Sequence, residues 1–158
     1  MKDNSDKYSI RTASLKDTPD LVRLRRIMFI SMGVQDKDSL DKGDSAVTEY
    51  FQRTIPTKEF LAWVVENGKG NIIACGGLVI DQHPPGPRNF TGKVGYIMNL
   101  VVDEDYRNNG IATRIMNTIL AYIKEKEISF VSLHATEMGR SIYEKFGFNS
   151  TNEMRLVI

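Results

Sequence analysis

The sequence has little of several things that would point to special chemistry or location. Its 158 residues include one cysteine, Cys75, so no intrachain disulfide can form. Two isolated histidines and one cysteine do not make a metal site. Lysine and arginine total 21 against 20 acidic residues, which argues against a dedicated nucleic-acid or membrane-surface binder, because such proteins are usually clearly basic.

Long apolar runs are also lacking. None approaches the roughly 20 residues that cross a bilayer, and residues 1–7 lack the apolar core of a secretory signal. A hydrophobic fraction of 41% with 26% charged residues is that of an ordinary globular protein. We therefore expect a soluble cytoplasmic protein with a frayed tail over 1–7 and one domain over 8–158, long enough to bury one core.

Strand and helix patterns alternate along the chain. Isoleucines four residues apart predict the clearest helix, over 111–126, and an apolar run predicts the clearest strand, over 94–103. Asp17 and Pro19 are typical of the start of a first helix. Further strands are expected over 8–13, 61–65, 72–80, 130–135 and 154–158, helices over 46–54 and 139–146, and loops over 33–45 and 83–89. This order indicates an α/β or α+β architecture.

Three arginines, Arg23, Arg25 and Arg26, occupy the polar face of that first helix. They suit either an anionic ligand or solvent, and we interpret them as a solvated face. Cys75 lies in an apolar strand and is interpreted as an inert core thiol.

The most informative segment runs from Ile97 to Ala112, where an apolar strand is followed by an acidic turn and a glycine-containing loop that opens into a helix. A helix start offers unpaired N–H groups and the positive end of the dipole, which suit a phosphate or diphosphate. Gly110 would let the backbone approach such a ligand, and Arg107 could add charge-assisted hydrogen bonds. No Walker lysine follows, and the further glycines of the dinucleotide fingerprint are missing.

Two motifs here resemble those of the GNAT (Gcn5-related N-acetyltransferase) superfamily. Arg107-Asn108-Asn109-Gly110-Ile111-Ala112 resembles the signature Q/R-x-x-G-x-G/A, and Ile142-Tyr143-Glu144-Lys145-Phe146-Gly147-Phe148 resembles the second signature, with isoleucine in the leucine position. One helix and one strand fit between the two motifs, and the resemblance extends over roughly 8–158.

The resemblance implies a central mixed, mostly antiparallel sheet, flanked by about four helices, whose fourth and fifth strands splay apart to admit acetyl-CoA. It implies that the pantetheine arm pairs with the strand edge at Leu100, Val101 and Val102. The diphosphate would lie on the segment Arg107 to Thr113. Thr136 falls where many members carry an asparagine that bonds the pantetheine, and a hydroxyl can make only part of that contact.

The implied reaction is direct attack of an amine on the acetyl thioester in a ternary complex. By resemblance, the Tyr143 hydroxyl protonates the departing thiolate, and a tyrosine pKa near 10 keeps it protonated at neutral pH. Asn99 interrupts an apolar strand, so its amide needs partners: either backbone groups at a strand bulge, or the substrate amine or a water. Glu66, Glu104, Glu137 and His134 are available as general base, and none is singled out.

The acceptor is a small-molecule or peptide amine in this family, and homodimers are frequent. Asp36, Asp38, Asp41 and Asp44 suggest a cationic amine. Apolar walls are offered by Met28, Phe29, Met32, Tyr50, Phe51 and Trp63, which equally suit the core. Two alternatives to an N-acetyltransferase stay open: a non-catalytic acetyl-CoA sensor, and an enzyme that uses another acyl-CoA.

Overall fold

The computed structural model describes residues 7–158. Its elements are β1 (Tyr8–Thr12), α1 (Thr18–Ser31), α2 (Lys37–Thr57), β2 (Phe60–Asn67), β3 (Ile72–Gln82), β4 (Lys93–Val102), α3 (Ile111–Glu125), β5 (Phe130–Leu133) and α4 (Glu137–Lys145), with short 3₁₀ turns η2 (Leu15–Asp17) and η3 (Glu104–Tyr106). The part of the prediction that concerned residues 1–6 falls outside the described residues.

The five strands form one sheet in the order β1-β2-β3-β4-β5. Neighbours are antiparallel except β4 and β5, which run parallel. A parallel pair needs a crossover, and α3 supplies it. The mixed, mostly antiparallel sheet with four α-helices confirms the predicted fold class.

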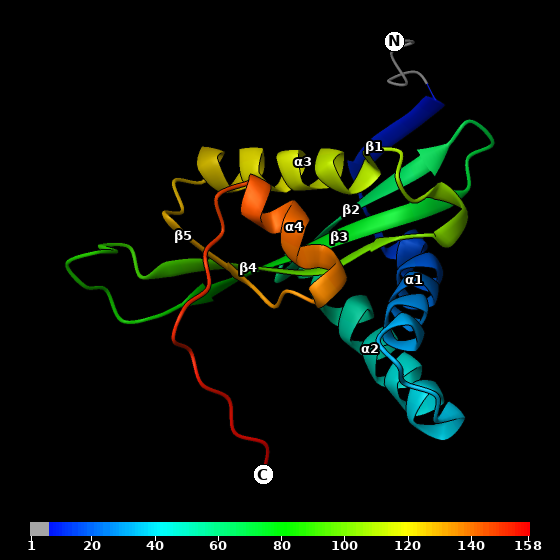
Figure 1. Cartoon of the computed structure of the whole chain (residues 1–158), viewed down its shortest axis with the longest axis horizontal. Helices are drawn as coiled ribbons and strands as arrows, with labels where there is room; N and C mark the ends of the chain where they lie inside the picture. Colours follow the sequence, from blue (N-terminus) through cyan, green and yellow to red (C-terminus); the bar gives the residue numbers. More distant parts are fainter. Residues whose placement is uncertain (1–6) are drawn as a thin grey trace.

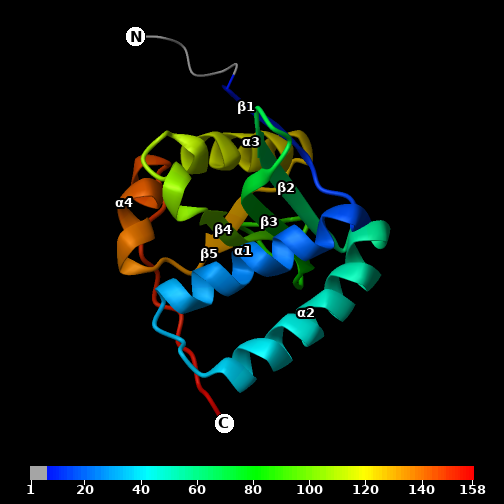
Figure 2. The ribbon, with the colours of Figure 1, turned by 90° about the vertical axis from the view of Figure 1, so that its right-hand side faces the viewer.

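Helices cover both faces of the sheet (Figure 1). On one face α3 packs through Ile111, Ile115 and Ile119, and we call this the α3 side. On the other face Leu21, Leu24 and Phe51 of α1 and α2 form a second cluster, which we call the α1–α2 side. The turned view shows the sheet between these helix layers (Figure 2). The predicted isoleucine stripe of α3 is buried as expected.

Two glycines in β3 allow close packing on both faces. A Cβ added to Gly76 would lie 2.5 Å from Ile115 Cγ2, and one added to Gly77 would lie 2.5 Å from the Phe60 ring. The sheet therefore needs glycine at both positions, because real side chains cannot approach so closely. The predicted close approach at this pair is confirmed, and at Gly76 the approaching element is α3.

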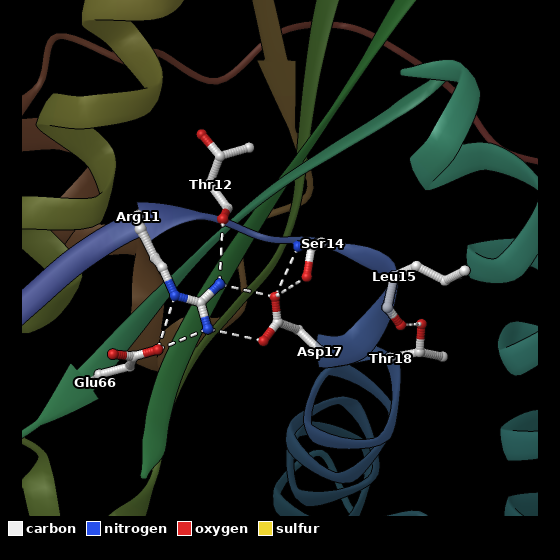
Figure 3. A network of polar contacts seen from close by, with 7 residues as sticks. All are labelled: Arg11, Thr12, Ser14, Leu15, Asp17, Thr18 and Glu66. Atoms are coloured by element: carbon white, nitrogen blue, oxygen red, sulfur yellow. Dashed lines mark hydrogen bonds and ion pairs between the residues drawn. The ribbon is translucent and has the colours of Figure 1, made fainter. Parts of the chain in front are cut away.

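The N-terminal end of α1 is fixed by a polar network (Figure 3). Arg11 on β1 donates to both carboxylate oxygens of Asp17 at 2.8 Å and contacts Glu66 of β2 at 2.6 Å. The Ser14 amide donates to Asp17 Oδ2 at 2.7 Å. These bonds lower the pKa of the buried Asp17 to about 2, with the Arg11 hydrogen bonds the largest cause and burial opposing them. Asp17 thus joins two strands to the helix start.

The predicted loop over 33–45 is wrong for most of its length. Helix α2 begins at Lys37 and continues through the predicted short helix over 46–54 to Thr57. Asp36 caps it by accepting a hydrogen bond from the Ser39 amide at 2.9 Å, so a polar run that looked like a loop is a capped first turn. The Lys37–Asp41 pair, four residues apart, adds support.

The predicted closing strand over 154–158 is also wrong. These residues have no regular secondary structure, and Met154 and Leu156 are 98% and 82% exposed. In Figure 1 the segment after α4 runs across the view of β4 and β5 and then extends beyond the sheet to the C-terminus. An apolar run becomes a strand only where a neighbouring edge can pair with it, and this one meets none in the described chain.

The other predicted elements are found with ends shifted by a few residues. The proline-containing segment over 83–89 is a loop with one isolated bridge, Gly86 to Asn89. Within residues 7–158, no helix is long and apolar enough to span a membrane.

Candidate active site

The end of β4 has an edge that no strand covers. β5 pairs with β4 only from Val94 to Ile97. β4 continues to Val102, so its residues beyond Ile97 pair with β3 on one side and with no strand of the described chain on the other. This divergence leaves the edge of β4 from Leu100 to Val102 without a strand neighbour, the geometry to which an extended ligand can add, and the Val102 carbonyl there accepts from Arg107.

A β-bulge lies within this segment. Cys75 pairs with Val101 and Gly77 with Met98, so Asn99 and Leu100 together face Gly76. Asn99 has a φ of 54°, in the left-handed region that asparagine tolerates better than most residues. The bulge shifts the alternation of side chains: Ile97 and Leu100 both pack on the α3 side.

The bulge directs Asn99 toward the α1–α2 side. Its Oδ1 accepts a hydrogen bond from a terminal nitrogen of Arg25, and its backbone carbonyl accepts a weak one from Cys75 Sγ at 3.4 Å. The predicted bulge is present, but the partner of the amide is a side chain of α1, which neither interpretation of Asn99 had included. The break in an apolar strand was the available signal, and nothing in it pointed to Arg25.

The loop before α3 presents a series of free backbone donors. None of the N–H groups from Asn108 to Thr113 donates a hydrogen bond within the described chain, and the first bond of the helix runs from the Arg114 amide to the Gly110 carbonyl at 3.1 Å. Asn108 and Gly110 have positive φ values of 62° and 73°. Such alternation turns successive amides toward one concave side, which suits an anion.

Gly110 is required here by conformation and leaves room for a ligand. It is the N-cap of α3, and a Cβ added to it would meet nothing within 4 Å. No acidic residue lies in the first turn of α3. Within residues 7–158, no group therefore neutralises the helix dipole or bonds the free amides of the loop.

The side chains around this loop hold its shape. Asn109 Nδ2 donates to the carbonyls of Tyr106 and Arg107, both at 3.0 Å. Arg107 donates from Nε to the Val102 carbonyl at 3.2 Å and lies 3.7 Å from Glu104. Arg107 is thus partly engaged, and it links the loop to the open end of β4.

Tyr143 lies on α4 and packs on the α3 side, and Thr136 is the N-cap residue of the same helix. The Tyr143 ring contacts Phe148 edge to face at 6.1 Å between centroids. Its hydroxyl has no hydrogen-bond partner among residues 7–158 and is not fully buried. Burial of the ring raises the pKa of Tyr143 above its usual value, so the hydroxyl stays protonated at neutral pH. The Thr136 hydroxyl caps α4 by accepting from the Gly139 amide at 3.2 Å, which leaves its proton available.

The solvated-face interpretation fits the first-helix arginines only in part, because Arg23 and Arg26 are solvent-accessible but also form ion pairs, and Arg25 is half-buried. Arg23 bonds Asp20, Asp103 and the Ile72 carbonyl, and Arg26 bonds Asp41 and Asp44. Arg25 is half-buried, and its guanidinium lies 4.8 Å from the Phe29 ring centroid. Their spacing in the sequence placed the three arginines on one face of α1. In the folded chain, packing of α1 against β4 and α2 gives each arginine different hydrogen-bond partners.

The acidic residues proposed for a cationic acceptor are largely occupied. Asp36 caps α2, and Asp41 and Asp44 pair with Arg26. Asp38 is exposed in the first turn of α2. The cluster therefore supplies less free negative charge than its composition suggested.

The candidate bases are scattered, and the proposed walls are mostly core. Glu66 binds Arg11, Glu104 lies near Arg107, and Glu137 and His134 are exposed. Phe51 and Trp63 are buried, Met28 and Tyr50 pack against Phe51 and its neighbours, and Met32 is exposed. Burial raises the pKa of the Cys75 thiol to about 12, in agreement with an inert thiol.

A five-stranded sheet whose β4 and β5 stop pairing just before a bulge in β4, next to a helix start without a side-chain cap, has the GNAT fold of the similar solved structures. The model of the Acetyltransferase (GNAT) family matches residues 25–148, and the chain belongs to this family.

Two solved structures resemble the whole chain. A GCN5-related N-acetyltransferase from Ralstonia eutropha JMP134 is 33% identical, with a TM-score of 0.88 over 96% of this chain and 98% of that one. A predicted acetyltransferase from Clostridium acetobutylicum, solved with acetyl-CoA, is 30% identical, with a TM-score of 0.86 over 96% of each chain.

Among curated proteins, the uncharacterized N-acetyltransferase YitH of Bacillus subtilis (strain 168) is 29% identical over 90 residues, or 57% of this chain. The alignment spans 28% of the length of that relative.

Proposed function

We propose that this chain is an acetyl-CoA-dependent N-acetyltransferase that moves the acetyl group to a primary amine by direct attack in a ternary complex, without an acyl-enzyme. The observation that carries the proposal is the row of unbonded backbone N–H groups from Asn108 to Thr113, at the start of a helix with no acid in its first turn. Such a site suits a diphosphate. The Clostridium acetobutylicum relative, 30% identical, was solved with acetyl-CoA.

The residues present fit this cosubstrate. The amides from Asn108 to Thr113 would hold the diphosphate, with Arg107 at the side of the loop. The open edge of β4 from Leu100 to Val102 would pair with the pantetheine amides, and the free proton of Thr136 would add one bond. When bound, acetyl-CoA supplies an activated acetyl thioester.

Tyr143 has the properties of the general acid. Its hydroxyl is unpaired and accessible, and its pKa is raised by burial, so it carries a proton to give to a leaving thiolate at neutral pH. Asn99 would serve as a positioning residue, because the bulge fixes its amide beside Arg25 at the point where β4 becomes open.

We also propose one domain over 8–158 that acts in the cytoplasm, in keeping with a single buried free thiol. The acceptor is proposed to be a small molecule or peptide, and a homodimer is the oligomeric arrangement to test first.

Thiol release from acetyl-CoA across a panel of amines tests the function, with calorimetry of acetyl-CoA alone as the second measurement. We expect tight binding and amine-dependent release. Binding without release for any amine would favour the sensor alternative, and no binding would remove both. Competition between acetyl-, succinyl- and longer acyl-CoA decides the acyl group.

A further inference from the structure

The first helix carries one arginine, Arg25, that forms no ion pair with any of residues 7–158. Arg23 and Arg26 each form ion pairs with two carboxylates. Arg25, on the same helix, is half-buried, and no carboxylate of residues 7–158 lies within salt-bridge distance of it. Burial is the largest cause that lowers the pKa of Arg25, and Asp44, the carboxylate that partly offsets this effect, is already bonded to Arg26.

Most donors of Arg25 are unused. A guanidinium has five N–H groups, and within the described chain only one terminal nitrogen of Arg25 donates, to Asn99 Oδ1. No fully buried side-chain nitrogen in the described chain lacks a partner, so the remaining donor nitrogens of Arg25 are not fully buried. The Phe29 ring lies 4.8 Å from the guanidinium and restricts its orientation.

Arg25 lies beside the open end of β4, where its unused donors could contact an acceptor. Its partner Asn99 lies in the bulge where β4 loses β5, and Arg25 reaches it from the α1–α2 side. The phosphate-binding amides lie at the start of α3, on the opposite face of the sheet. A cosubstrate held from the α3 side would bring its thioester to the open edge of β4, so the amine would approach from the side of Arg25.

We infer that Arg25 binds a carboxylate of the acceptor, so that the amine substrate is an amino acid or a similar compound with a carboxylate near its amine. This inference rests on the proposed function and names the substrate class of that site. A planar guanidinium with two free nitrogens can bind a carboxylate through two parallel hydrogen bonds, which neither water nor the amine itself can do as well. A charged acceptor group also compensates a cation that folding has left partly desolvated.

Matched acceptors test this directly. Thiol release would be measured with leucine, phenylalanine and glutamate, with the corresponding C-terminal amides, and with spermidine as a cationic amine without a carboxylate. We expect kcat/KM for each free acid to exceed that for its amide by about 10-fold or more, the size of one charged hydrogen-bond pair. Equal rates, or a preference for amides or spermidine, would overturn the inference.

Variants separate substrate binding from structure. Arg25→Gln should abolish the preference for acids over their amides and leave the affinity for acetyl-CoA unchanged, whereas loss of the Asn99 contact should lower kcat/KM for acids and amides by the same smaller factor. Arg25→Lys should recover part of the difference, because it keeps the charge but not the two-pronged geometry. Arg26→Gln, on the same helix and toward α2, is the matched control and should keep the preference. A loss that is equal for acids and amides would reduce Arg25 to a positioning residue for Asn99.

A binding measurement distinguishes failure of this inference from failure of the proposed function. With CoA present, the N-acetyl derivatives of the same acids and amides would be compared by thermal unfolding. A rise in Tm with the acids only, lost in Arg25→Gln, supports the carboxylate site even where no amine is acetylated. No difference between acids and amides in this measurement overturns it.

Discussion

The two faces of the sheet differ in how far their charged groups are paired within the described chain. On the α1–α2 side, most charged groups are paired within the chain: Arg11 with Asp17, and Arg26 with Asp41 and Asp44. On the α3 side, the positive helix start has no acid in its first turn, and the amides before it are unbonded. Charge that is satisfied internally contributes to stability, whereas charge that is left unsatisfied marks where a ligand can bind. Arg25 is the exception on the α1–α2 side, because its one hydrogen-bond partner within residues 7–158 is the neutral amide of Asn99.

The sharpest test of this contrast is Tyr143→Phe on the α3 side. We expect turnover to fall by about 10²-fold or more, the usual contribution of a general acid, while the affinity for acetyl-CoA changes little. Steady-state thiol release and calorimetry measure the two quantities. The raised pKa of Tyr143 also predicts that turnover does not lose its acid until the pH rises above about 10. Unchanged turnover in the variant would exclude the role.

A larger side chain at Gly110 tests the proposed diphosphate site at the amides from Asn108 to Thr113. Gly110→Val places a β-branched side chain at a φ of 73°, so we expect at least a 10-fold loss of acetyl-CoA affinity together with about 1–2 kcal/mol of unfolding free energy. Gly110→Asn is the matched control, because asparagine tolerates this conformation and separates strain from obstruction. Calorimetry and urea unfolding report the two effects. If the valine variant still binds acetyl-CoA like the wild type, the diphosphate does not lie there.

A substitution at Asp17 tests the α1–α2 side, where the paired charges are expected to stabilise the fold. Its pKa is lowered in the folded state, so its stabilising effect is complete above the unfolded value of 3.8 and is lost as the pH falls through about 2. Asp17→Asn should therefore cost about 1–2 kcal/mol at neutral pH, allowing for the solvent exposure of Arg11, and the difference from wild type should vanish near pH 2. Affinity for acetyl-CoA should not change. A loss of affinity in Asp17→Asn would break the contrast between the faces.

The smallest effect is expected for Arg26→Gln. Its pairs with Asp41 and Asp44 are solvent-accessible, and such pairs contribute little because water screens them. Thermal unfolding should show a smaller change than Asp17→Asn, and the change should shrink further in high salt. An effect larger than that of Asp17 would mean that this pair fixes α2 against α1 far more firmly than surface charge normally does.

The sequence predicted the α3 side well because its signals are local. The isoleucines of α3, Gly110 before them and the Tyr143 motif each lie within a few residues of what they determine. The order and alternation of the strands followed from the same short-range patterns, and the comparisons confirm the family.

The α1–α2 side was harder because its determinants are distant in the chain. Arg25 meets Asn99 across 74 positions and Arg23 meets Asp103 across 80, and no spacing rule identifies such partners. The capped start of α2 was not recognised because aspartate, serine and glycine also favour loops. The segment over 154–158 was wrongly predicted as a strand. Its apolar pattern favours a strand, but the segment pairs with no strand edge of the described chain.

The absence of a side chain at Gly76 has a consequence beyond packing. Ile115 rests almost on the bare backbone of β3, directly across from the β4 bulge. Gly76 therefore sets the distance between α3 and the sheet. It also sets the distance between the amides before α3 and the open edge of β4, although Gly76 itself would contact neither end of a bound cosubstrate. Even a methyl group there would push the helix outward and alter both distances. A substitution buried in the sheet can thus change the distance between the sites proposed for the diphosphate and for the pantetheine arm of the cosubstrate.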